Sequence, residues 1–188
     1  MPERRLNFGS AHDRVEGFKN VDAMHWDGNT DIMHDMTDFP YPFNDNSIEE
    51  IRSVESLEHV SFKLTEKIIK ECYRMLKEGG KLYIQVPDAG KAMEYYVNHQ
   101  ICSCCAHKPR DIKDAHGKLD CPLCEGKGMI HPNRWLYTFL GAQKHPFDAH
   151  LAIFTEDIMK KHLIMAGFKN IHFKFDQYGW KIKVSAYK

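Results

Sequence analysis

The sequence predicts an α/β domain built on a doubly wound, mostly parallel sheet that ends in an antiparallel hairpin. Short strand-like segments alternate with amphipathic helical segments along most of the chain, which is typical of strand–helix–strand units covered on both faces. A cysteine-rich stretch interrupts this pattern and predicts a small zinc-binding insertion. We therefore expect one domain over residues 1–188, with an inserted lobe at residues 101–131.

Length and charge narrow the class of protein. The chain has 188 residues, about the size of one domain, and 26 basic side chains balance 26 acidic ones. A balanced charge argues against a protein that coats nucleic acid. The sequence has neither the apolar core of a secretory signal nor a stretch long enough to cross a membrane. We expect a cytoplasmic protein without a membrane partner, in which cysteines bind metals more often than they form disulfides.

Residues 6–54 predict four short strands. Leu6–Gly9 is apolar, residues 10–20 form a polar loop too short for a full helix with its connections, and Val21–Asp22 resumes the apolar pattern. Asp31–Asp35 and Ile48–Val54 are the third and fourth candidates. The polar residues that follow each strand are the first candidates for a site.

The clearest helix is predicted over residues 63–77. Its apolar residues recur at spacings of three and four, which places them on one stripe, and Gly79 and Gly80 supply a stop. Lys81–Pro87 then alternates apolar and polar side chains as a strand does. A further helix is predicted over residues 89–99.

The C-terminal part predicts one helix and a hairpin. Thr155 is a typical N-cap, residues 158–166 carry a helical apolar stripe, and Gly167 closes the helix. Apolar and polar residues alternate in Ile171–Phe175 and in Lys181–Tyr187, which is typical of two paired strands.

Two Cys-x-x-Cys pairs, separated by fifteen residues, have the spacing of a structural zinc site. The predicted ligands are Cys102, Cys105, Cys121 and Cys124. Four thiolates leave zinc no open position, so the role would be structural, and the lobe would act as a lid or select the substrate. Alternatives are a disulfide, metal-free thiols, or a mixed site using one of the neighbouring side chains Cys104, His107, His116 and His131.

The order of these segments resembles the class I S-adenosylmethionine (SAM)-dependent methyltransferases, in particular compact members with a short first loop. The resemblance covers about residues 5–100 and 145–188. It is carried by Leu6-Asn-Phe-Gly9, Gly17-Phe-Lys-Asn-Val-Asp22, Asp31-Ile-Met-His-Asp35, Phe39-Pro-Tyr-Pro-Phe43, Glu50 through His59, Tyr73 through Leu82, Val86-Pro-Asp88 and Phe154 through Phe168. It implies a Rossmann-like fold with SAM bound at the carboxyl ends of the strands.

The resemblance assigns cofactor-binding roles to particular residues. Asp22 would accept hydrogen bonds from the ribose hydroxyls, Asp35 and the backbone of Met36 would lie by the adenine, and Glu55 and Ser56 would line the methionine side. Independently, glycine after the first strand allows a ligand to approach the backbone closely, which is the role expected of Gly9.

Two histidines are candidates for the acceptor side. His59 and its neighbour Glu58 follow the fourth strand, where a substrate group or a general base would sit. His150 would face the same cleft from the C-terminal half. Each of these functional assignments has a purely structural alternative. Gly9 would then be an ordinary turn glycine, Asp22 and Asp35 would be turn or capping acids, and His59 would be a structural histidine.

Three functions follow from these observations. The first is methyl transfer to a small molecule or glycan, with the zinc lobe structural and substrate-selecting. The second is a methyltransferase that acts on nucleic acid or protein and docks through the zinc lobe. The third is an inactive zinc-bearing binding module on a methyltransferase scaffold.

Overall fold

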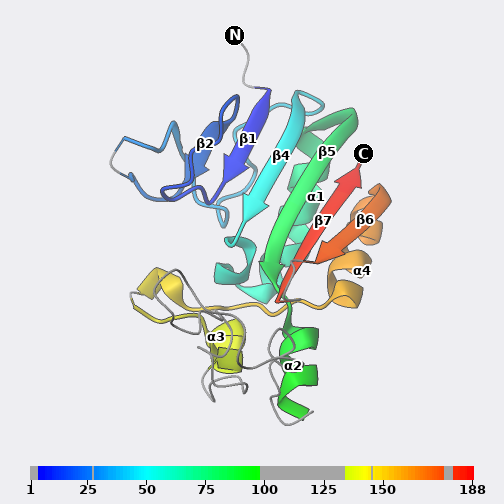
Figure 1. Cartoon of the computed structure of the whole chain (residues 1–188). Helices are drawn as coiled ribbons and strands as arrows, with labels where there is room; N and C mark the ends of the chain where they lie inside the picture. The colour runs from blue at the N-terminus through cyan, green and yellow to red at the C-terminus, as the bar shows by residue number, and fades with distance from the viewer. Residues whose placement is uncertain (1–3, 27, 98–133, 145, 176–179) are drawn as a thin grey trace, which may run out of the picture.

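A seven-stranded sheet organises the computed structural model, which describes residues 4–26, 28–97, 134–144, 146–175 and 180–188. The spatial order of the strands is β3-β2-β1-β4-β5-β7-β6. In chain order they are β1 (Arg5–Phe8), β2 (Lys19–Asp22), β3 (Ile32–Met33), β4 (Ile48–Val54), β5 (Leu76–Pro87), β6 (Lys169–Phe175) and β7 (Lys181–Tyr187). Figure 1 shows the twisted sheet, whose central strand β4 lies between β1 and β5.

The first five strands are parallel, and β7 runs antiparallel to both of its neighbours, β5 and β6. The predicted C-terminal hairpin is therefore confirmed, and its second strand lies inside the sheet. The order reverses at β1, because the chain first builds outward through β2 and β3 and then returns to β4. Such a switch point leaves a crevice outside the carboxyl ends of the strands.

Among the described residues, four α-helices accompany the sheet: α1 (Thr65–Met75), α2 (Ala89–Val97), α3 (Arg134–Leu140) and α4 (Glu156–Ala166). Helices α1 and α4 contact each other and pack behind the sheet in Figure 1, while α2 and α3 contact each other below its carboxyl edge. Where the chain is described, no helix is long and apolar enough to cross a membrane.

The core lies between the sheet and the α1–α4 layer. Alternate strand residues enter it, among them Leu6, Ile51, Leu82 and Ile182, each at most 1% exposed. The neighbouring residues of β4, β5 and β7 point to the other face and are mostly polar and half-buried. Figure 1 shows no helix over that face of these strands. The expectation of helices on both faces is thus not met in the described part of the chain.

A polar network takes the place of a helix between β1 and β2. The buried Asn7 amide donates to the Asp13 carbonyl at 2.9 Å and to the Asn20 side chain at 3.2 Å. The Asn20 amide in turn donates to the Asn29 carbonyl at 3.0 Å. These bonds hold the short loop against the strands and leave the carboxyl edge of the sheet open.

The expected first helix is shorter than predicted at its C-terminal end. Helix α1 ends at Met75, and Leu76 is already extended, fully buried and paired with Ile48. The predicted stop glycine, Gly79, lies instead within β5 at φ +75°, where the β4–β5 register shifts. Burial of the Leu76 side chain in the sheet stabilises the fold more than an extension of the helix would.

Helix α4 confirms the signals that predicted it. The Thr155 hydroxyl accepts a hydrogen bond from the Ile158 amide, and Gly167 takes the left-handed conformation at φ 104°. Helix α2 follows β5 as predicted from Ala89 and is described as far as Val97.

Candidate active site

A pocket of about 440 Å³ lies at the carboxyl edge of the sheet, beside the switch point. Each of the first four strands contributes residues at or just beyond its end. The walls comprise Gly9, Ala11, His12, Asp22, Ala23, Met24, Trp26, His34, Asp35, Met36, Glu55, Ser56, His59, Val60, Phe147 and Asp148. This is the crevice where doubly wound sheets bind ligands.

The structure brings all six predicted cofactor-binding residues to this one pocket. They are Gly9 after β1, Asp22 at the end of β2, Asp35 and Met36 after β3, and Glu55 and Ser56 after β4. They come from four strands that parallel pairing aligns, so their carboxyl ends meet at one edge.

Gly9 allows the ends of β1 and β4 to approach closely. Its backbone has φ +61°, and a Cβ at this position would lie 2.3 Å from the Cβ of Ser56. The Ser56 hydroxyl is 2.6 Å from that of Ser53 and 3.3 Å from the Phe8 carbonyl, so it cannot easily retreat. A larger residue would therefore push β1 and β4 apart.

Backbone amides fix the two acids. The Asp22 carboxylate accepts hydrogen bonds from the amides of Ala11 at 2.9 Å and Met24 at 3.0 Å, one on each oxygen. One oxygen of Asp35 accepts from the amide and hydroxyl of Thr37. A carboxylate oxygen has two lone pairs, so Asp22 keeps acceptor capacity on both oxygens for a pair of ligand hydroxyls.

Glu55 is held on the opposite wall in a left-handed backbone conformation, at φ 50°. Its carboxylate accepts a hydrogen bond from the Gln85 amide at 3.2 Å and lies 3.1 Å from the Lys181 ammonium. Strands β5 and β7 thus orient a side chain that follows β4.

The two candidate histidines lie together although 90 residues separate them. Their rings meet edge to face with centroids 5.0 Å apart. His59 lines the large pocket, whereas His150 lines a neighbouring one. Burial lowers the pKa of His59, and the adjacent His150 acts in the same direction. His59 is therefore favoured in its neutral form, with one ring nitrogen available as a base.

Glu58 is the most deeply buried acid next to this pair. It is 2% exposed, and burial raises its pKa well above the usual range, with Glu55 contributing in the same sense. The sequence placed Glu58 beside His59 after the fourth strand, as a position for substrate contact or a general base, but did not predict its burial. Its burial is decided by the chain segment around Leu151, whose amide donates to the Glu58 carbonyl at 2.8 Å.

Aromatic residues of the pocket wall were also missed. His12 and Trp26 meet edge to face at 4.8 Å, one from the loop after β1 and the other from the loop after β2. Phe147 lies in the short 3-10 turn Pro146–Asp148 and is 64% exposed. The positions of His12 and Trp26 just beyond strand ends were the available signal for these two residues.

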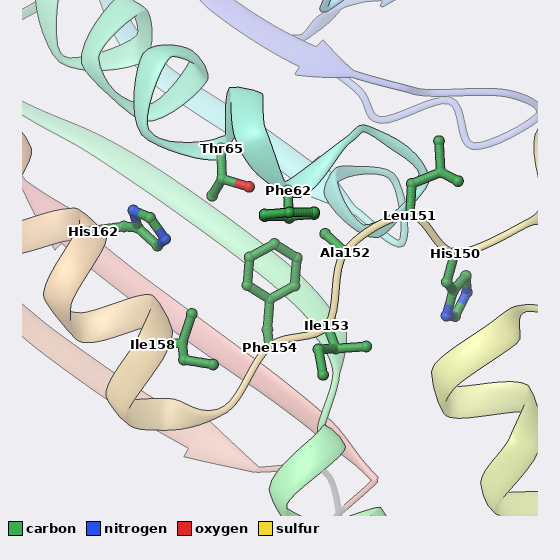
Figure 2. Close-up of a pocket in the computed structure, with 9 residues that line it drawn as sticks. All are labelled: Phe62, Thr65, His150, Leu151, Ala152, Ile153, Phe154, Ile158 and His162. Atoms are coloured by element: carbon green, nitrogen blue, oxygen red, sulfur yellow. The ribbon is translucent and has the colours of Figure 1, made fainter.

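A second, more apolar pocket of about 410 Å³ adjoins the first, and Figure 2 shows its lining. Phe62 and Phe154 face each other at its centre, His162 and Ile158 enter from α4, and His150 lies at the far end. His150 thus belongs to the partition between the two pockets.

The predicted zinc ligands Cys102, Cys105, Cys121 and Cys124 lie outside the described residues, as do Cys104 and the whole 101–131 lobe. Cys72 is described as a free, buried thiol of α1, and burial raises its pKa to about 12. It belongs to the core.

Comparisons with known proteins agree with this geometry. Residues 16–84 match the family model of a methyltransferase domain. None of the curated proteins matches the sequence.

Solved structures similar to the chain share its fold at low identity. A SAM-dependent methyltransferase from Archaeoglobus fulgidus is 11% identical, with a TM-score of 0.60 over 99% of this chain and 86% of the other. A SAM-dependent methyltransferase from Thermotoga maritima is 16% identical, with a TM-score of 0.58 over 100% of this chain and 84% of the other.

A third similar structure was solved with ligands. The 1,6-didemethyltoxoflavin-N1-methyltransferase of Burkholderia thailandensis, with its substrate and S-adenosylhomocysteine bound, is 12% identical. Its TM-score is 0.55 over 100% of this chain and 71% of the other. The methyltransferase-domain match and the shared Rossmann-like fold together support a SAM-dependent methyltransferase.

Proposed function

We propose that the protein transfers the methyl group of SAM to a small-molecule or glycan acceptor. The observation that carries this proposal is the convergence of Gly9, Asp22, Asp35 and Ser56 from four strand ends on one pocket at the switch point. Bound SAM supplies an electrophilic methyl group on a positively charged sulfur. The balanced charge of the chain favours a small acceptor over nucleic acid.

In this proposal the chain's own residues position the reactants. Asp22 and Asp35 bind the nucleoside part of the cofactor, and Glu55 and Ser56 line the methionine side. His59 and His150 lie at the acceptor end, where an Nε2 lone pair can accept a proton or bind a cation. Alignment of acceptor and methyl group supplies much of the rate in such a transfer.

Calorimetry with SAM and S-adenosylhomocysteine tests cofactor binding. Asp22→Asn should weaken binding by about 10- to 100-fold, because hydrogen bonds to a charged carboxylate contribute about 1.5–3 kcal/mol. Asp38→Asn removes the same charge from an exposed residue outside the pocket wall and should leave the affinity unchanged. No heat from the wild-type protein at millimolar ligand would refute the proposal and favour an inactive binding scaffold.

We further propose that the four cysteines of the 101–131 lobe bind one structural zinc ion in the reducing cytoplasm. Their spacing supports this. Metal analysis should find one equivalent of zinc that is lost in Cys121→Ser. The control Cys72→Ala changes a thiol of the core and should keep this equivalent. The lid role is to be abandoned if deletion of residues 101–131 leaves a folded protein with unchanged substrate turnover.

A further inference from the structure

We propose that Glu58, His59 and His150 bind a divalent metal cation at the wall of the active-site pocket. Each offers one ligand atom, and these atoms all lie within 4.8 Å of one another. Two ligands on opposite sides of a cation at about 2.1 Å would be about 4.2 Å apart, so small side-chain movements would complete the site.

The hydrogen bonds of both imidazoles favour metal binding. Nδ1 of His59 lies 3.1 Å from the Ala149 carbonyl, and Nδ1 of His150 lies 2.9 Å from the Thr138 carbonyl. A carbonyl oxygen only accepts, so each Nδ1 carries the hydrogen and each Nε2 keeps its lone pair. A histidine that ligates a metal through one nitrogen usually donates its other N–H in this way.

The third ligand is a buried carboxyl group with an unsatisfied oxygen. Within the described residues, Oε2 of Glu58 has no hydrogen-bond partner, although the side chain is only 2% exposed. The nearby Lys181 ammonium is paired with Glu55 instead. Burying such an oxygen without a partner costs free energy. A cation between Glu58 and the two imidazoles would offset that cost.

The backbone holds the three side chains in place. Glu58 and His59 lie in the 3-10 turn Leu57–His59, directly after β4. The Glu58 carbonyl accepts hydrogen bonds from the amides of Leu151 and Ala152 at 2.8 and 3.1 Å. These bonds fix the segment that carries His150 against the turn, so the ligands from two distant parts of the chain are already assembled.

Two imidazole nitrogens and one carboxylate suit first-row divalent ions such as Mn²⁺ or Zn²⁺ better than Mg²⁺ or Ca²⁺, which prefer oxygen ligands. Three protein ligands also leave coordination positions open. If the proposed methyl transfer holds, an acceptor hydroxyl bound at such a position would lose its proton more readily and become a better nucleophile.

Titration with Mn²⁺, followed by electron paramagnetic resonance, tests the site in the full-length chain. The protein is stripped with a chelator and given one equivalent of Zn²⁺, which thiolates take in preference to Mn²⁺. The loss of the free Mn²⁺ signal should then correspond to one equivalent of Mn²⁺ bound per chain. Glu58→Gln, which keeps the size of the side chain, and His150→Ala should each weaken this binding at least 10-fold.

His162→Ala is the matched control, because it removes another half-buried imidazole of the neighbouring pocket without touching the cluster. It should bind Mn²⁺ as the wild type does. The proposal would be overturned if the wild-type protein did not bind Mn²⁺ at millimolar concentration. It would also be overturned if wild type and Glu58→Gln bound Mn²⁺ with equal affinity. The titration contains no SAM, so its failure is distinguishable from a failure of cofactor binding.

Discussion

At the scale of single residues, Gly9 connects the stability of the sheet to the shape of the pocket. It combines a left-handed backbone with a Cβ position occupied by Ser56. The sequence suggested only that glycine would let a ligand approach the backbone. The structure adds that glycine is needed for β1 and β4 to end side by side.

Gly9→Ala should lower the free energy of unfolding by about 2–5 kcal/mol, through backbone strain and overpacking. Gly28→Ala is the control: its φ is also positive, at +76°, but a Cβ there meets nothing within 4 Å. It should cost only about 1–2 kcal/mol. Chemical denaturation measures both. Adding Ser56→Gly should recover part of the Gly9→Ala loss, and no recovery would contradict the steric explanation.

Glu71 ties α1 to the segment after β3. Its carboxylate accepts hydrogen bonds from the Arg74 guanidinium at 2.9 and 2.8 Å and from the Tyr41 amide at 2.8 Å. The hydrogen bonds from Arg74 lower the pKa of Glu71 below its usual range. An acid with a lowered pKa stabilises the fold above its unfolded pKa, and this contribution disappears as the pH falls through its folded pKa.

Glu71→Gln should therefore destabilise the protein by about 1 kcal/mol at pH 7, a value reduced by solvent screening. The difference from wild type should shrink as the pH falls below the usual range of a glutamate and through the lowered pKa of Glu71, where the wild-type carboxylate takes up its proton. Denaturation across a pH series measures this. Glu66→Gln removes an exposed partner of Lys70 and serves as control, with no measurable effect expected. A Glu71→Gln effect that stays constant down to pH 3 would exclude the ionic contribution.

At the scale of elements, strand β7 shows how differently the two faces of the sheet are used. Ile182 is fully buried under the helix layer, whereas its neighbour Lys183 is half-exposed on the opposite face. The alternation of apolar and polar residues in β5 and β7 is typical of a sheet with one solvated face. This sequence signal outweighs the general expectation that α/β sheets are covered on both faces.

Ile182→Ala should cost about 2–5 kcal/mol, because it leaves a cavity between the sheet and the α1–α4 layer. Lys183→Ala should stay within about 0.5 kcal/mol of wild type. Comparison of the two melting curves checks this prediction. A loss at Lys183 comparable to that at Ile182 would mean that the polar face is covered in solution.

At the scale of the whole molecule, the strand order determines which residues share a site. Parallel pairing and the reversal at β1 align four strand ends, so Asp22 and Glu55 line one pocket although the residues between them form other elements. The segment around residues 149–152 then crosses to the turn after β4. That crossing creates the cluster of Glu58, His59 and His150.

The sequence by itself determined the strands, α4, the terminal hairpin and the residues that follow each strand, because hydrophobic periodicity, caps and turn glycines are local signals. It did not determine where α1 ends, which face of the sheet stays open or why Gly9 must be glycine. Nor did it reveal that Glu58 is buried beside two histidines. These features depend on contacts between segments far apart in the chain, and only the tertiary structure sets their distances, burial and hydrogen-bond partners.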